Sequence, residues 1–182
     1  MTASEKIENL RRTICSLLCA FSLGGWNSAM SLPREPITVP FSLAEKGFSI
    51  TTDFAAVGRK YRYLFSLDLV CHKNNEEDCQ RLAKLWGGPS SHDRESFELK
   101  PVGIPIPLRL TVSRIVEKKE EMVYENDFFQ LASWAGSRTQ LSKLITYIQL
   151  PPARYRVHLV ALDAVPELAE TKINLRILIE RK

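Results

Sequence analysis

The segment from Leu150 to Lys182 constrains the fold more than any other part of the chain. It opens with Leu150-Pro151-Pro152, and the two prolines lack the backbone donors that a continuing strand needs. Tyr155 then begins a run in which every second residue is apolar, which predicts a strand with one buried face. Leu150, Pro151 and Tyr155 have the arrangement of a tyrosine corner, which fixes a crossing between the two sheets of a Greek-key sandwich.

Two further segments have the period-2 pattern of strands. The last part of the chain places Ile173, Leu175, Ile177 and Ile179 on one face, and we expect it to pair with the Tyr155 strand as a final hairpin. The segment at residues 60–71 places large apolar side chains on one face, which is typical of a central strand. About seven such strands predict a mainly β protein, an antiparallel immunoglobulin-like β-sandwich.

One short helix is expected at about residues 75–86. Asn75 is a good N-cap, acidic residues follow it, and Gly87 ends the apolar stripe. We expect Trp86, at the end of this helix, to cap the core. The prolines at residues 33–40 and 101–107 predict edge segments. We also expect a charged turn at 117–121, a loop at 133–138 and a strand at 144–150.

The N-terminus has the three parts of an export signal. Basic residues precede an apolar run at 14–23 that is too short to span a bilayer, and small residues follow at 29–31. We therefore expect a signal peptide at residues 1–31, a single β-sandwich domain at residues 32–182 and a periplasmic location. The alternative is a lipoprotein acylated at Cys19, which Leu18 disfavours because a small residue is needed there.

The expected cleavage leaves Cys71 and Cys79 as the cysteines of the mature chain. In an oxidising compartment two cysteines this close are candidates for a disulfide. A zinc site built on Cys71, His72 and Cys79 would lack a fourth ligand at a suitable spacing. Two free thiols are the remaining possibility.

The sequence carries no motif of a known catalytic centre, neither a nucleophile elbow nor a phosphate loop nor a His-Glu-x-x-His pair. His92-Asp93, beside Ser90-Ser91, resembles parts of a triad, but adjacent loop residues rarely converge. The formal net charge of +4 comes from interleaved acids and bases, which argues against nucleic acid as a partner. We therefore expect a protein that is not an enzyme and needs no cofactor or metal.

Binding to another protein is easier to support. Trp134 lies beside small residues and is a candidate interface anchor. If the last two strands pair, Arg154, Arg156 and Arg176 form a basic stripe on one sheet face. That stripe could meet an acidic partner or anionic lipid head groups, or could simply aid solubility.

Several short segments, in order, resemble an uncharacterised family of small exported proteins of Gram-negative bacteria. The matching segments are Pro36–Phe41, Tyr61–Leu67, Gly103–Leu108, Trp134–Gly136, Leu150–Val157 and Val165–Leu168. The resemblance implies an envelope location, a sandwich fold and no known catalytic residues.

Some such envelope proteins are immunity partners of secreted effectors. Our first hypothesis is therefore a non-enzymatic binding module, an immunity or accessory protein that docks an envelope or effector protein. The alternatives are a structural envelope component that adds strands at a sheet edge, which proline-rich edges disfavour, and a hydrolase. Membrane contact is expected only if Cys19 is acylated.

Overall fold

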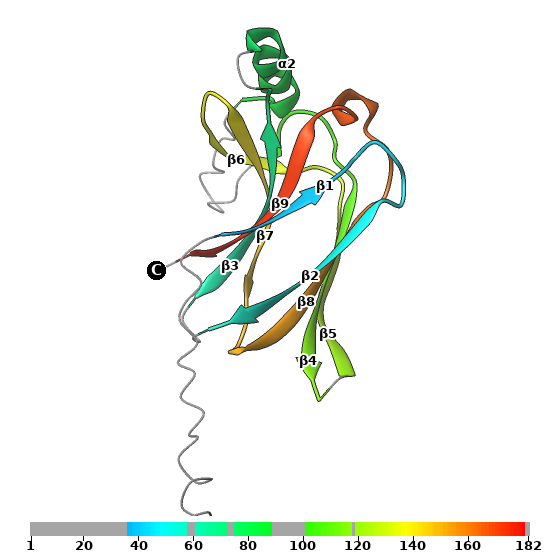
Figure 1. Ribbon diagram of the computed structural model, residues 1–182, viewed down its shortest axis with the longest axis vertical. Helices are drawn as coiled ribbons and strands as arrows, with labels where there is room; N and C mark the ends of the chain where they lie inside the picture. The colour runs from blue at the N-terminus through cyan, green and yellow to red at the C-terminus, as the bar shows by residue number, and fades with distance from the viewer. Residues whose placement is uncertain (1–35, 58–60, 73–74, 89–100, 118, 181–182) are drawn as a thin grey trace, which may run out of the picture. The chain divides into compact units, whose positions relative to one another are not determined.

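The computed structural model describes residues 36–57, 61–72, 75–88, 101–117 and 119–180. Within these ranges the chain forms nine strands, one α-helix and one short 3-10 helix, and Figure 1 shows their arrangement. The strands are β1 (Ile37–Phe41), β2 (Ser49–Ala56), β3 (Arg62–Val70), β4 (Leu108–Val116), β5 (Lys119–Phe128), β6 (Ala132–Gly136), β7 (Gln140–Gln149), β8 (Ala153–Ala161) and β9 (Lys172–Glu180). The helices are α2 (Glu76–Trp86) and η1 (Pro166–Leu168).

The strands form two antiparallel sheets. One sheet has the order β1-β9-β3-β7-β6 and the other the order β2-β8-β4-β5. Every pairing between neighbouring strands is antiparallel. The prediction of a mainly β, antiparallel sandwich with one short helix is confirmed, while the immunoglobulin-like type stays a prediction.

The core lies between the two sheets. Strand β3 contributes Tyr63, Phe65, Leu67 and Leu69, all of which are buried, as the alternating pattern predicts. β3 lies inside its five-stranded sheet, between β7 and β9, so both of its edges are paired. Burial of these large side chains is the main driving force for assembling the two layers.

A ring cluster anchors one end of this core. Phe54 of β2 stacks on Tyr155 of β8 with ring centroids 5.7 Å apart and contacts Tyr63 of β3 at 5.4 Å. The Tyr155 hydroxyl donates a hydrogen bond of 2.9 Å to the carbonyl of Pro151. This bond closes the connection by which the chain leaves β7 in one sheet and enters β8 in the other. Burial raises the pKa of Tyr155, so its hydroxyl stays protonated and remains a donor.

Removing that hydroxyl should weaken the fold measurably. We expect Tyr155→Phe to lower the free energy of unfolding by about 1 kcal/mol, because the ring still packs and only the bond to Pro151 is lost. Urea denaturation followed by fluorescence measures the change. Tyr61→Phe is the matched control, and an equal loss in the two variants would contradict a specific role for the Tyr155 bond.

The final hairpin predicted from the sequence is wrong. β8 pairs with β2 and β4, whereas β9 pairs with β1 and β3 in the opposite sheet. The connection at residues 162–171 buries Val165 and Leu168, so it packs against the core while it crosses between the sheets. Its turn-forming residues resemble a hairpin loop, but its two apolar residues belong to the core.

Three expected boundaries also differ from the structure. Residues 133–136 belong to β6 and do not form a loop, because Ala132 and Ser133 are buried beside β7. Strand β5 already begins at Lys119, so the charged turn is shorter than expected. Strand β7 begins at Gln140, four residues before the expected start at Leu144. β5 and β7 begin earlier because polar residues pair with a neighbouring strand, and β6 forms because small residues pair with β7. Pairing of this kind is not visible in the hydrophobic pattern.

Candidate functional site

Helix α2 lies at one end of the sandwich and carries one wall of the candidate site (Figure 1). The side-chain oxygen of Asn75 accepts a hydrogen bond of 3.0 Å from the backbone N–H of Asp78, as an N-cap should. Gly87 ends the helix with φ of 85°, a left-handed conformation that favours glycine. The expected helix is therefore confirmed.

A disulfide fastens the first half of α2 to the end of β3. Cys71 and Cys79 are joined by an S–S bond of 2.03 Å, with their Cα atoms 5.1 Å apart. The predicted disulfide is confirmed, and neither sulfur is left as the thiolate that the zinc interpretation requires. Cys71 is buried, whereas Cys79 is half-buried and faces the groove described below.

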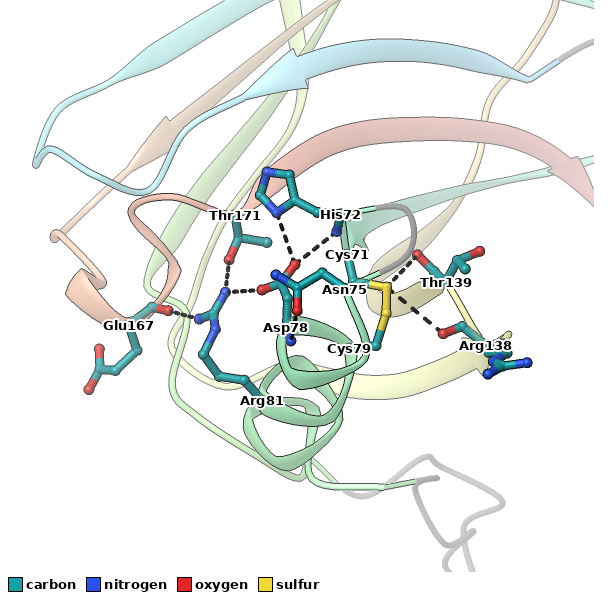
Figure 2. Close-up of polar contacts among 10 residues, drawn as sticks. All are labelled: Cys71, His72, Asn75, Asp78, Cys79, Arg81, Arg138, Thr139, Glu167 and Thr171. Atoms are coloured by element: carbon teal, nitrogen blue, oxygen red, sulfur yellow. Dashed lines mark hydrogen bonds and ion pairs between the residues drawn. A yellow bond between two sulfur atoms is a disulfide. The ribbon is translucent and has the colours of Figure 1, made fainter.

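Asp78 makes a second attachment on the same half of the helix (Figure 2). Its carboxylate accepts hydrogen bonds from the backbone N–H of His72 at 2.8 Å and from Arg81 at 2.8 Å, and lies 3.0 Å from the His72 ring. Arg81 also donates to the carbonyl of Glu167 and to the Thr171 hydroxyl, at 2.6 and 3.1 Å. The network therefore joins α2 to both β3 and the η1–β9 segment.

The backbone bond from His72 and the Arg81 guanidinium hold the pKa of Asp78 at about 2, below its ordinary value of 3.8. Because the folded pKa is the lower one, the ionised carboxylate stabilises the fold fully above about pH 4. This stabilisation is lost as the pH falls through about 2.

Asp78→Asn should therefore destabilise the protein in a pH-dependent way. We expect a loss of about 1 to 2 kcal/mol at pH 7, which shrinks toward zero near pH 2 because the wild-type carboxylate is then also protonated. Urea denaturation across this pH range measures the difference. Glu77→Gln, at an exposed position of the same helix turn, is the control, and a pH-independent difference for Asp78→Asn would contradict the role of the charge.

Lys143 of β7 holds the other end of α2. Its side chain is fully buried, and its ammonium donates to the carbonyls of Trp86 at 2.8 Å, Leu131 at 3.4 Å and Val102. Trp86 is the last residue of α2, where the helix dipole favours a positive charge. Burial lowers the pKa of Lys143 to about 8, so at neutral pH the ammonium form prevails and three backbone segments share one cation.

The backbone packs unusually closely at the junction where the end of α2 meets the segment at 101–107 and β7. A Cβ atom on Gly103 would lie 2.4 Å from the carbonyl oxygens of both Leu85 and Trp86, so a side chain does not fit there. The N–H of Ile104 donates a hydrogen bond of 2.9 Å to Leu85. The indole of Trp86 is half-buried and donates to the carbonyl of Ser142 at 3.2 Å. The end of the helix is therefore fixed to the proline-rich segment and to β7.

Replacing Lys143 should loosen this junction. We expect Lys143→Met to lower the free energy of unfolding by about 2 kcal/mol at pH 7, because three buried carbonyls lose a donor while the apolar stem is retained. Lys172→Met, at an exposed position of β9, should change it by less than about 0.5 kcal/mol. Urea denaturation compares the two variants. Unchanged stability of Lys143→Met would show that the cation does not hold the junction.

A groove opens between α2 and the turn that joins β6 to β7. It encloses about 220 Å³, and a second hollow of about 390 Å³ adjoins it and shares Glu76, Cys79, Arg138 and Thr139. Its apolar lining comes from α2, from the inner face of the first sheet and from the disulfide, and consists of Leu69, Cys71, Cys79, Leu82, Ala83 and Leu141. Sγ of Cys71 lies 3.6 Å from the carbonyl oxygen of Thr139, so the disulfide also contacts the turn (Figure 2).

The rim of the groove is charged. The guanidinium of Arg138 and the carboxylate of Glu76 form an ion pair of 3.3 Å, with side chains 87% and 63% exposed. So exposed a pair contributes little stability and can exchange partners. Among the described residues no cluster of three histidine, cysteine or acidic side chains could hold a metal ion. The arrangement therefore suits the burial of an apolar group flanked by charge.

The basic stripe predicted from the sequence is wrong, because β8 and β9 lie in different sheets. Arg156 is held by Asp53 at 2.7 and 2.9 Å and by Glu120 at 2.5 Å, so its charge is neutralised. Arg176 lies in the other sheet, 3.5 Å from the buried carboxylate of Asp68. Arg154 alone of the three is exposed with no ion pair in the described part of the chain.

The structure places Trp134 within β6, although we expected it in a loop. The register of β6 on β7 skips Trp134, between Ser133 and Ala135, so it lies at a β-bulge and remains 38% exposed. The expected signal peptide at 1–31, Cys19 and His92 lie outside the described residues.

Sequence reasoning missed Lys143 and Arg138. Lys143 occupies an inward position of β7, opposite Leu67, and an earlier start of that strand would have revealed a lysine in a core register. Arg138 had no recognisable signal, because its role depends on the helix that faces it.

The fold and the site define a β-sandwich protein whose end is closed by a disulfide-tethered helix with a groove beside it. The chain belongs to the family described as "Domain of unknown function (DUF5625)", whose model matches residues 38–179. The resemblance to an uncharacterised family is thereby confirmed. No curated protein matches the chain.

A crystal structure of a protein from Sulfurospirillum deleyianum has the same fold. It matches with a TM-score of 0.67 at 18% identity, over 81% of this chain and 99% of that one. In the described part of the chain no helix has both the length and the hydrophobicity to cross a membrane.

Proposed function

We propose that this protein is a non-enzymatic binding module of the bacterial envelope, an immunity or accessory protein that docks a segment of a partner protein. The groove between α2 and the β6–β7 turn carries the proposal. Its lining is apolar, and its walls are held by a disulfide, by Asp78 and by Lys143. A site that is fixed before binding loses less entropy when a ligand arrives.

The occupant that fits is an extended protein segment with a large apolar side chain next to a carboxylate. The apolar side chain would enter the groove between Leu82 and Leu141. The carboxylate would compete with Glu76 for Arg138, because that pair is long and largely exposed. An envelope location is supported by the disulfide, since such bonds persist in oxidising compartments, and by the export pattern at residues 1–31.

Two alternatives remain as outcomes of the test. A structural envelope component would self-associate or bind polymer, and no partner of defined stoichiometry would be found. A hydrolase would turn over a lipid or peptidoglycan substrate, and His92→Ala would abolish that activity. The described lining of the groove is largely apolar and contains no histidine or lysine that could act as a general base, which favours binding over hydrolysis.

The test is affinity capture from envelope extracts with the oxidised protein, residues 32–182, followed by direct binding to the captured protein. We expect Ala83→Arg, which fills the groove from an exposed helix position, and Arg138→Glu each to weaken binding at least about tenfold. Lys84→Ala, at another exposed position of α2, is the control. A partner that binds all three variants with wild-type affinity would contradict the groove as its site.

A further inference from the structure

Strand β5 forms one edge of the second sheet, and its hairpin with β4 lies at the end of the sandwich opposite α2 (Figure 1). Among the described strands it pairs with β4 alone, so its other side presents unpaired backbone N–H and C=O groups. It is ten residues long, whereas β2, the other edge strand of this sheet, has eight residues and the edge strands β1 and β6 have five each. Met122 and Val123 lie in the middle of β5 and are 64% and 47% exposed, and no other described strand pairs along this edge.

The edges differ in how well they are protected. β1 contains Pro40, and β6 carries the Trp134 bulge and a bridge from Ala132 to Pro101. β5 contains no proline. Prolines therefore do not oppose strand addition at β5.

The strand is also held in an extended conformation. Arg109 of β4 forms a bidentate pair with Asp127 at 2.6 and 2.8 Å, and Thr111 donates to Glu125 at 3.0 Å. The hydroxyl of Tyr124 lies 3.5 Å from that of Thr146, across the sandwich. A partner strand would therefore meet an edge that is already ordered.

The charges of β5 select the partner. Its ten residues include four carboxylates, Glu120, Glu121, Glu125 and Asp127, and one lysine, Lys119. Antiparallel pairing with a second copy centred on Val123 would place Glu121 opposite Glu125 and Lys119 opposite Asp127, but Asp127 is already paired with Arg109. Parallel in-register pairing would place each carboxylate opposite itself. Like charges directly opposite each other are destabilising, so the strand disfavours its own copy.

We propose that β5 accepts an extended basic segment of another protein as an added strand. Backbone hydrogen bonds to the free edge would supply affinity, and lysine or arginine side chains would pair with carboxylates of β5. Apolar residues alternating with the basic ones would cover Met122 and Val123. Glu121 can form an ion pair with an added basic strand, because its side chain is 57% exposed and its present ion pair with Arg114 is long, at 3.4 Å.

The test uses a fluorescent peptide of about eight residues in which lysine and valine alternate, a length that suits a typical strand. We expect the oxidised protein to bind it in an anisotropy titration, more weakly as salt rises, and to gain hydrogen-exchange protection along β5. A peptide of alternating glutamate and valine should not bind. Equal binding of a lysine–proline peptide, which cannot form a ladder, would show that charge attraction alone is responsible and would overturn the proposal.

Two variants locate the site. Val123→Pro should weaken binding at least about tenfold, and it should fold because the β4 register skips Val123 at a bulge. The double change Glu121→Gln and Glu125→Gln should weaken binding severalfold and flatten its salt dependence. If Val123→Pro does not fold, the double variant and the exchange data decide. The groove variant Ala83→Arg should bind the peptide normally, which separates this edge from the proposed function.

Two further results would contradict the addition of a basic partner strand at β5. The first is wild-type affinity in both β5 variants. The second is a dimer of the protein that Val123→Pro abolishes, because the edge would then take a second copy of the chain.

Discussion

The ammonium of Lys143 is the interaction on which the end of this molecule depends. A buried cation without a carboxylate beside it is costly unless other groups solvate it, and here three backbone carbonyls do so. Those carbonyls belong to the last residue of α2, to the segment at 101–107 and to the residue before β6, which are remote from one another in sequence. One side chain thereby replaces the hydrogen bonds that these irregular segments would otherwise make to water, and fixes their relative positions.

The helix that Lys143 holds is what distinguishes this end of the sandwich. At its first half α2 is tied to β3 by the disulfide and to η1 by Arg81, and at its last residue it is tied to β7 by Lys143 and Trp86. Toward the β6–β7 turn the polar contacts of the described residues are fewer, namely the Glu76–Arg138 pair and the approach of Cys71 to the turn carbonyls. The groove therefore lies on the side where the helix is fixed by its ends, and Leu69 and Leu141 line it there. Rigid walls around an incompletely filled apolar space are a property of binding sites, since a mobile helix would collapse onto the gap.

The sequence predicts the layers well and their connections poorly, for a physical reason. Alternation in β3, β8 and β9 identifies buried faces, because each residue's environment is set by the sheet it belongs to. Caps and spacing likewise predict α2 and the disulfide. Whether β8 and β9 pair depends on how the connection at residues 162–171 packs, and the burial of Val165 and Leu168 sends β9 to the other sheet. The predicted basic stripe was wrong because it required β8 and β9 to pair. Lys143 was missed because the expected strand began at the apolar Leu144, which left the lysine before it outside the strand.

The two binding surfaces proposed for this protein, the groove and the β5 edge, would gain affinity in different ways. An apolar groove gains affinity by burying the side chains of its partner. An exposed apolar surface also promotes nonspecific association, which the charged rim of Glu76 and Arg138 reduces. A free strand edge gains affinity from backbone groups that any chain can satisfy, so its specificity must come from side chains. In the proposal for β5 that specificity would come from carboxylates, which oppose a second copy and favour a basic strand. Asp127 and Glu120 are already paired with Arg109 and Arg156, so the face of this sheet is nearly neutral there. The choice of a basic partner strand would therefore depend mainly on the other two carboxylates of β5, Glu121 and Glu125.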